Sequence, residues 1–170
     1  MFYEDNLLKS IINKELDRKG QIFFVTPRIK EIEDLEKKIK KNFPSINYSI
    51  IHSRLNTIEI EKIYTNFFEK KIDLLLSTAM IESGLDISNV NTIIINKPYL
   101  FGLSQLYQLR GRVGRSSIQA YAYLLLEKNT ALSEERLRRL QLISRIDSLG
   151  AGFSIAANDL DIRGAGNIVG

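Results

Sequence analysis

The stretch Gln21-Ile-Phe-Phe-Val25, followed directly by Thr26-Pro27, decides the fold of this chain. It is a short apolar run rich in residues that favour β-strands, and a proline closes it, so it predicts a buried strand. Before it, apolar residues recur at helical spacing from Asp5 to Lys19, and Gly20 is a candidate cap for that helix. After it, apolar residues from Ile29 to Ile39 predict a second helix.

The same alternation of strand and helix continues along the chain. Asn56, with Glu59 three residues later, matches a capping box and predicts the start of another helix. Further strands are predicted at Tyr48–Ile51, Asp73–Ser77, Asn91–Asn96 and Gln119–Leu126. Strands separated by helices of this length predict an α/β fold, a parallel sheet with helices on both faces.

The pattern changes after Glu127. Ser133, followed by two glutamates, predicts a helix whose apolar face carries Leu137, Leu140, Ile143 and Ile146. Leu149–Phe153 is expected to break that helix, and Ser154–Asp161 is expected to return as a second one. The sequence therefore predicts an α/β domain over residues 1–128 and a C-terminal α-helical hairpin over residues 129–170, outside the sheet.

Composition excludes several classes of site. The chain has 170 residues, 44 % of them hydrophobic, which is enough for one ordinary domain with an appendage. It has no cysteine and one histidine, so disulfides, thiolate metal sites and histidine metal clusters are excluded. No apolar run is long enough to span a membrane and no signal peptide is present, so we expect a cytoplasmic protein with no membrane partner. The net charge of +4 permits nucleic acid as a partner, although a basic but inert surface fits as well.

Polar residues follow the predicted strands where each strand ends. Thr26-Pro-Arg28 follows the first, His52-Ser-Arg54 the second and Ser77–Asp86 the third. The carboxyl ends of parallel strands share one edge, so these residues are expected to crowd one rim of the sheet. There His52 and Arg54 could contact phosphates of a nucleic acid; a structural hydrogen bond by His52 at the strand end is the alternative.

A basic stretch follows the fourth strand. Gln105–Ser116, called the arginine stretch below, contains Arg110, Arg112 and Arg115 with Gly111 and Gly114 between them. A guanidinium group can bind two phosphate oxygens at once, and neighbouring glycines leave it less covered by side chains. Two such groups on one turn suit a transferring phosphoryl group; a solvated basic helix end is the other interpretation.

The wording of two stretches resembles superfamily-two helicases and translocases, whose motor lobes are RecA-like. Gln108–Arg115 resembles their motif VI, which implies that Arg112 and Arg115 are catalytic arginine fingers for an ATP held by a neighbouring lobe. Gln108 takes the place often held by a histidine that couples the sites. Ser77–Ile87 resembles motif V, which implies that Thr78 holds the nucleic-acid backbone, while Gly84 and Asp86 line the nucleotide site. Taken alone, Asp86 also fits a turn or capping role.

The C-terminal segment narrows the resemblance. Leu149–Phe153 with Asp159–Gly166 resembles the translocation motif shared by bacterial transcription-repair coupling factors and branch-migrating fork helicases. Gly-Ala-Gly-Phe and Arg-Gly-Ala-Gly favour the coupling factors. The resemblance implies that Arg163 couples ATP hydrolysis to movement on duplex DNA, and the same residue also fits a helix cap. The motif is expected to continue beyond Gly170.

Two motor motifs are absent from the sequence. It has neither a Gly-x-x-x-x-Gly-Lys-Ser/Thr phosphate loop nor an acidic segment for magnesium. We therefore expect ATP as cofactor, with magnesium supplied by an N-terminal RecA-like lobe of the same protein, and an inactive fragment without that lobe. The implied partners are double-stranded DNA, that lobe and, through other domains, RNA polymerase and excision-repair proteins. The rivals are the equivalent lobe of a branch-migrating helicase and a non-catalytic nucleic-acid-binding module.

Overall fold

The structure is a computed structural model that describes residues 2–78, 90–111, 113, 119–127, 130–145 and 152–155. Within them the helices are α1 (Phe2–Asp17), α2 (Ile29–Asn42), α3 (Thr57–Phe68), the short 3-10 helix η1 (Pro98–Leu100), α4 (Leu103–Arg110) and α5 (Glu134–Arg145). The strands are β1 (Ile22–Thr26), β2 (Tyr48–Ile51), β3 (Leu74–Thr78), β4 (Thr92–Asn96), β5 (Tyr121–Leu125) and β6 (Gly152–Ile155). The predicted strands and helices before residue 128 are thus present in their predicted order.

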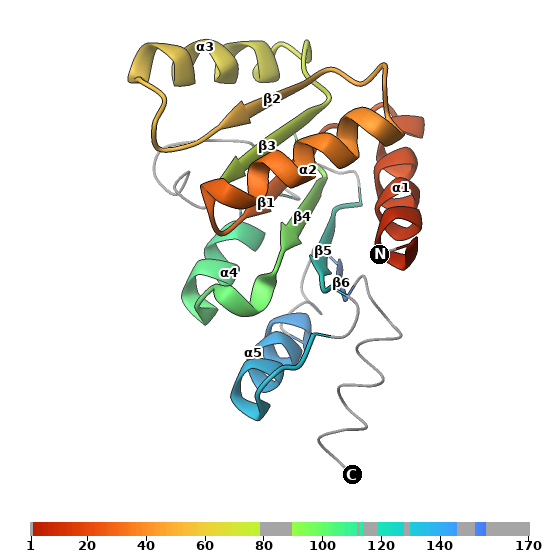
Figure 1. Cartoon of the computed structure of the whole chain (residues 1–170), viewed down its shortest axis with the longest axis vertical. Coiled ribbons are helices and arrows are strands. Elements are labelled where there is room, and N and C mark those ends of the chain that lie inside the picture. Colours follow the sequence, from red (N-terminus) through yellow and green to blue (C-terminus); the bar gives the residue numbers. More distant parts are fainter. Residues whose placement is uncertain are drawn as a thin grey trace.

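The strands form one parallel sheet in the order β2-β3-β1-β4-β5-β6. β1 is central and pairs with β3 on one side and β4 on the other (Figure 1). All its residues are buried, as expected for a strand covered on both faces. The predicted parallel sheet is confirmed.

The two faces of the sheet carry separate cores because successive side chains of a strand point to opposite faces. Phe24 faces the layer of α1 and α2, where it packs with Ile12 and Leu35. Phe23 faces the opposite layer, where it packs with residues of α3, α4 and α5 such as Leu106 and Leu140. Helices α1 and α2 therefore cover one face, and α3, α4 and α5 cover the other, which confirms the predicted three layers.

Two helix ends follow local rules that the sequence predicts in part. The capping box of Asn56 and Glu59 is present at the start of α3, as predicted. At the end of α1 the left-handed residue is Lys19, with φ 59°, and not Gly20. Gly20 donates its N–H to the Glu15 carbonyl and Lys19 to the Leu16 carbonyl, which is a Schellman motif with Lys19 at C′. The prediction of Gly20 as the conformational cap was therefore wrong.

The C-terminal region differs from its prediction. The first helix is present as α5, and Leu137, Leu140 and Ile143 are buried on its predicted apolar face. Residues Gly152–Ile155, expected to end a break and begin a returning helix, instead form β6 beside β5. The exposed edge of β5 offers unpaired backbone groups, and pairing with them outweighs local helical preference. The helical hairpin is not confirmed, and its residues 146–151, which include Ile146 of the predicted apolar face, and 156–170 lie outside the described residues.

Candidate functional site

The carboxyl ends of the strands form one rim of the sheet, here called the carboxyl rim. β1 and β3 are in register, so Thr26 lies opposite Thr78 at this rim. His52 directly follows β2, and Asn96 ends β4 at the same edge. The predicted gathering of polar strand ends is confirmed for these residues.

Thr78 ends β3 and is almost completely buried, with 6 % of its surface exposed. Its neighbour Ser77 is fully buried, and the Ser77 hydroxyl donates a hydrogen bond of 2.8 Å to the Thr78 carbonyl. The Ser77 hydroxyl is therefore used inside the strand. The role of Thr78 on a nucleic-acid backbone stays a prediction.

His52 and Arg54 lie in the turn between β2 and α3. The Arg54 N–H donates to Nδ1 of His52 at 3.1 Å, so neutral His52 carries its proton on Nε2. His52 therefore makes a structural hydrogen bond within the turn, as its alternative interpretation required. The Arg54 side chain is exposed beside the rim. Phosphate contacts by either side chain remain predictions.

Helix α4 carries the first part of the arginine stretch. Leu106 and Leu109 are buried and fix the helix on the sheet, whereas Gln108 is exposed on its other side. Gly111 ends the helix with φ −66°, and a Cβ there would lie 3.5 Å from the nearest atom, the Gln108 carbonyl oxygen. The backbone at 111 thus makes no conformational demand for glycine.

Several predicted site residues have no described placement. Gly84 and Asp86 of the motif V stretch, Arg112 and Arg115 of the arginine stretch, and Arg163 lie outside the described residues. Val113, between the two arginines, is described and is 5 % exposed. The predicted roles of these residues therefore stay predictions.

A polar network at the carboxyl rim escaped the sequence analysis. The Asn96 amide donates to the Thr26 hydroxyl at 3.1 Å, and that hydroxyl donates to a carboxylate oxygen of Glu31 at 2.8 Å. The other Glu31 oxygen lies 3.5 Å from Nζ of Lys97, and Lys97 is 3.6 Å from a carboxylate oxygen of Glu127. The only signal in the sequence was the position of Asn96 at the end of a strand, like Thr26 and Thr78, because Lys97 after it carries no motif of its own.

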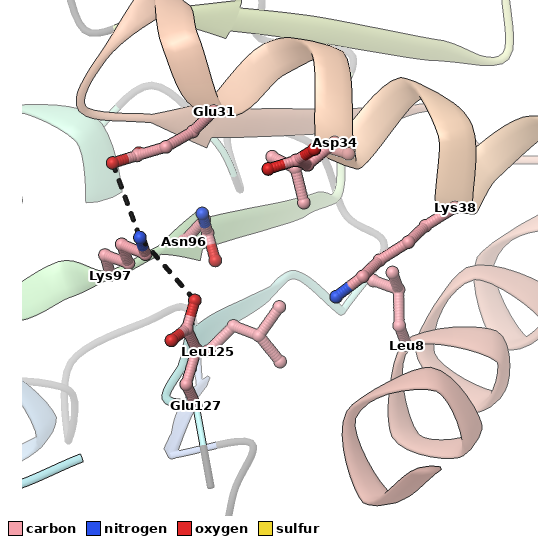
Figure 2. Close-up of a pocket in the computed structure, with 9 residues that line it drawn as sticks. Leu8, Glu31, Asp34, Lys38, Asn96, Lys97, Leu125 and Glu127 are labelled. Carbon is pink, nitrogen blue, oxygen red and sulfur yellow. Dashed lines mark hydrogen bonds and ion pairs between the residues drawn. The ribbon is translucent and has the colours of Figure 1, made fainter. Parts of the chain in front are cut away.

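The network borders an open pocket of about 320 Å³ between α1, α2 and the ends of β4 and β5. Figure 2 shows Lys97 between Glu31 and Glu127, with Asp34 and Lys38 of α2 lining the same space. Burial alone lowers the pKa of Lys97, but the carboxylates of Glu127 and Glu31 more than offset it, so the pKa of Lys97 is raised. Lys97 is therefore charged at neutral pH.

The described residues contain neither a membrane-spanning helix nor a cluster of metal-binding side chains. No helix in these ranges is both long and apolar enough to cross a membrane. No group of three or more His, Cys, Asp or Glu side chains in the same ranges could hold a metal ion.

Comparison with known proteins identifies the family. Residues 4–117 match the helicase conserved C-terminal domain. The chain belongs to this family. All 170 residues also align with the transcription-repair-coupling factor of Myxococcus xanthus at 46 % identity, and 168 align with that of Borreliella burgdorferi at 47 %. The predicted resemblance to transcription-repair-coupling factors is confirmed.

This chain corresponds to only a small part of the relatives that it matches. The two alignments span 100 % and 99 % of this chain but only 14 % and 15 % of the Myxococcus and Borreliella coupling factors. Among solved structures, RecG bound to a three-way DNA junction is similar over 96 % of this chain and 21 % of its own, with 35 % identity and a TM-score of 0.71. The RecA-like helicase fold predicted from the sequence is therefore confirmed, and the activity of the whole relatives comes to this chain only as a proposal.

Proposed function

We propose that this chain is the second motor lobe of an ATP-dependent translocase on double-stranded DNA, which displaces stalled RNA polymerase in transcription-coupled DNA repair. The observation that carries the proposal is the arrangement of strand ends. The segments that resemble motifs V and VI leave the sheet at the same rim, after β3 and β4, with only β1 between them. Identity of 42–47 % to coupling factors, over 97–100 % of this chain and 14–15 % of theirs, supports the choice of activity.

In the proposed lobe the ligands divide between segments. Thr78, with His52 and Arg54 on the neighbouring strand end, contacts the DNA backbone. Gly84 and Asp86 line the ATP cleft. A loop that leaves one strand end and touches both ligands is suited to coupling them.

The arginine stretch supplies the charge for phosphoryl transfer. Arg112 and Arg115 reach the γ-phosphate, whose negative charge spreads over its outer oxygens in the transition state. Gln108, on the exposed side of α4, and Arg163 transmit closure of the two lobes to the DNA. ATP brings the reactive phosphate; the phosphate loop and magnesium belong to an N-terminal RecA-like lobe.

The decisive test is DNA-stimulated ATP hydrolysis by the full-length protein that contains this lobe. Arg112→Ala and Arg115→Ala should each lower kcat by roughly 10³–10⁵-fold, the range for arginine fingers. ATP binding, measured separately by equilibrium titration, should change little because the other lobe holds the nucleotide.

Arg138→Ala is the matched control for that test. Arg138 is also an arginine of this lobe, but its side chain is 77 % exposed on α5 and pairs only weakly with Glu134 at 3.5 Å. Its removal should leave hydrolysis unchanged. If Arg112→Ala and Arg115→Ala hydrolyse ATP at the wild-type rate, neither residue is an arginine finger. A non-catalytic nucleic-acid-binding module would then become the favoured function.

The second candidate is the equivalent lobe of a branch-migrating fork helicase. It is favoured by the similarity to RecG, but the identity there is 35 %, against 46 % for the Myxococcus coupling factor. A stalled transcription complex and a model replication fork, offered to the same purified full-length protein, separate the two. ATP-dependent release of polymerase supports the coupling factor, and fork regression without release supports the rival.

A further inference from the structure

Lys97 adopts a backbone conformation that two features of the sequence make unfavourable. It lies directly after β4 with φ 49° and ψ 56°, in the left-handed region, which is unfavourable for a residue with a Cβ. It also precedes Pro98, whose ring favours extended backbone in the residue before it. Such a conformation persists only where surrounding contacts hold it.

The other left-handed lysines of the described chain have a local reason for their conformation. Lys19 and Lys70 each follow a helix and close it with a Schellman pair of hydrogen bonds, which is a common place for such a residue. Lys97 follows a strand and has no helix to close. Its conformation must therefore be held by contacts from other elements.

Those contacts are the two ion pairs and one backbone bond. Nζ of Lys97 lies 3.5 Å from Glu31 and 3.6 Å from Glu127, and the Lys97 N–H donates to the Leu125 carbonyl at 3.2 Å. The Glu31 side chain is 9 % exposed, against 47 % for Glu127, so the pair with Glu31 is the better shielded. The Thr26 hydroxyl holds the second oxygen of Glu31 and fixes the direction of that carboxylate.

The turn that Lys97 begins leads directly into the arginine stretch. Leu100 donates its N–H to the Lys97 carbonyl, which closes η1, and α4 starts at Leu103. Between Lys97 and α4, the Phe101 carbonyl accepts a hydrogen bond of 3.0 Å from Arg139 of α5, which holds the end of the turn next to α4. A change of direction at Lys97 would therefore act on the other end of the turn, through which the chain reaches α4.

We propose that Lys97 is a positioning residue, clamped by Glu31 and Glu127, that sets the direction in which the turn delivers the arginine stretch to its phosphate target. This inference rests on the proposed function, because only there does the placement of the arginines govern a rate. A misplacement of about 1 Å can lower a rate by roughly 10²-fold.

Lys97→Met in the full-length protein tests the clamp, because methionine keeps the Cβ and the length but removes the charge. DNA-stimulated ATP hydrolysis should show kcat lowered by about 10- to 100-fold, with the KM for ATP within about twofold of wild type. Lys97→Arg should restore most of the rate. Lys97→Gly accepts the left-handed backbone without the charge and should remain slow.

Lys37→Met is the matched control, because Lys37 pairs with Glu33 on the exposed side of α2, with both side chains more than 70 % exposed. It should leave kcat unchanged. Glu31→Gln should lower kcat in the same direction as Lys97→Met but less, since Glu127 remains. If Lys97→Met fails to fold, Glu31→Gln still tests the clamp. Wild-type kcat in both Lys97→Met and Glu31→Gln, or full recovery in Lys97→Gly, would overturn the clamp.

Hydrogen exchange gives a readout that does not depend on ATP hydrolysis. The amides of residues 99–111 should exchange several-fold faster in Lys97→Met than in wild type, while those of β1 and β3 should not change. If Arg112→Ala is active, the proposed function fails and exchange alone still tests the clamp. If Arg112→Ala is inactive and Lys97→Met matches wild type in exchange and kcat, the clamp fails and the proposed function stands.

Discussion

Two buried glutamates lie at opposite ends of the same sheet. Glu15 of α1, 1 % exposed, sits at the end where β4 begins, and Glu31 of α2, 7 % exposed, sits at the carboxyl rim. Both oxygens of Glu15 are bound by Arg18 at 2.7 Å, and the Thr92 hydroxyl also donates to it. Glu31 shares its charge between Thr26 and Lys97 beside an open pocket.

The difference between them is where their partners lead. Thr92 and Arg18 lie on the strand and helix that Glu15 joins, so that cluster only fixes α1 to the sheet. Lys97 begins the turn toward α4, so the Glu31 cluster reaches a segment that carries predicted site residues. A buried acidic residue therefore indicates a function only where the residues that it binds lead to a functional segment.

The largest expected effect separates the two acids by stability. Glu15→Ala should lower the free energy of unfolding by about 2–3 kcal/mol, because the buried Thr92 hydroxyl and part of Arg18 lose a charged partner. Glu31→Ala should lower it by about 1 kcal/mol, because water in the adjacent pocket can replace the carboxylate. Urea unfolding of the chain measures both. A loss at Glu31 equal to that at Glu15 would contradict the comparison.

The next effect sharpens the account of the Glu15 cluster. A Cβ at Gly20 would lie 1.9 Å from a carboxylate oxygen of Glu15, and that oxygen is held in place by Arg18. Gly20→Ala should therefore lower the free energy of unfolding by about 1–3 kcal/mol through overpacking.

A double-mutant cycle with Glu15→Ala is the control for this prediction. Most of the Gly20→Ala loss should vanish when Glu15 is already alanine, since the clash partner is gone. An additive loss would mean that Gly20 is needed for its backbone and not for space.

Much of the fold could be predicted because the strands are short apolar runs with clear ends. Phe23 and Phe24, adjacent in the sequence, each became the centre of a different core, as strand geometry requires. The strand β6 was missed because Phe153 lies between glycines and helix formers, and its partner β5 is distant in sequence. Pairing with a distant edge has no local signature.

The candidate site was predictable only where a residue type carries its own chemistry. His52 and Arg54 follow a strand, as predicted, and Thr78, named by its resemblance to motif V, ends one; their contacts with nucleic acid stay predictions. Lys97 follows a strand as well, but a lone lysine before a proline carries no motif, and its significance depends on Glu31, 66 positions away.

A smaller effect concerns a third acid, Glu36 of α2, whose side chain is more exposed than those of Glu15 and Glu31. The Tyr48 hydroxyl donates to Glu36 at 2.7 Å, and this bond, with Lys40, lowers the pKa of Glu36. Tyr48→Phe should lower the free energy of unfolding by about 1 kcal/mol at pH 7, discounted because the Glu36 side chain is 27 % exposed.

The pH dependence of that loss follows from the sign of the shift. A carboxylate with a depressed folded pKa contributes stability that is present above its unfolded pKa of about 4.5. It is lost as the pH falls through the lower folded value. Unfolding curves of wild type and Tyr48→Phe should therefore converge below about pH 4. A gap of unchanged size at pH 3 would mean that the contribution of the Tyr48 hydroxyl does not depend on the charge of Glu36.

The smallest expected effect concerns Gly111, whose surroundings differ from those of Gly20. Gly111 has helical backbone angles, and a Cβ there would make ordinary contacts at 3.5 and 3.6 Å with carbonyl oxygens of α4. Gly111→Ala should therefore raise the free energy of unfolding by up to about 1 kcal/mol, because alanine restricts the unfolded chain. Thermal unfolding of the chain measures the gain, with Gly20→Ala as the opposite case.

The same Gly111 variant also tests why the arginine stretch contains glycine. Nothing within the described fold demands glycine at 111, so any demand must come from a ligand or lobe that approaches the backbone there. In the full-length protein, a more stable Gly111→Ala with reduced ATP hydrolysis would mean that the absence of a side chain serves this approach. A more stable variant with wild-type hydrolysis would mean that the proposed chemistry does not require glycine at 111.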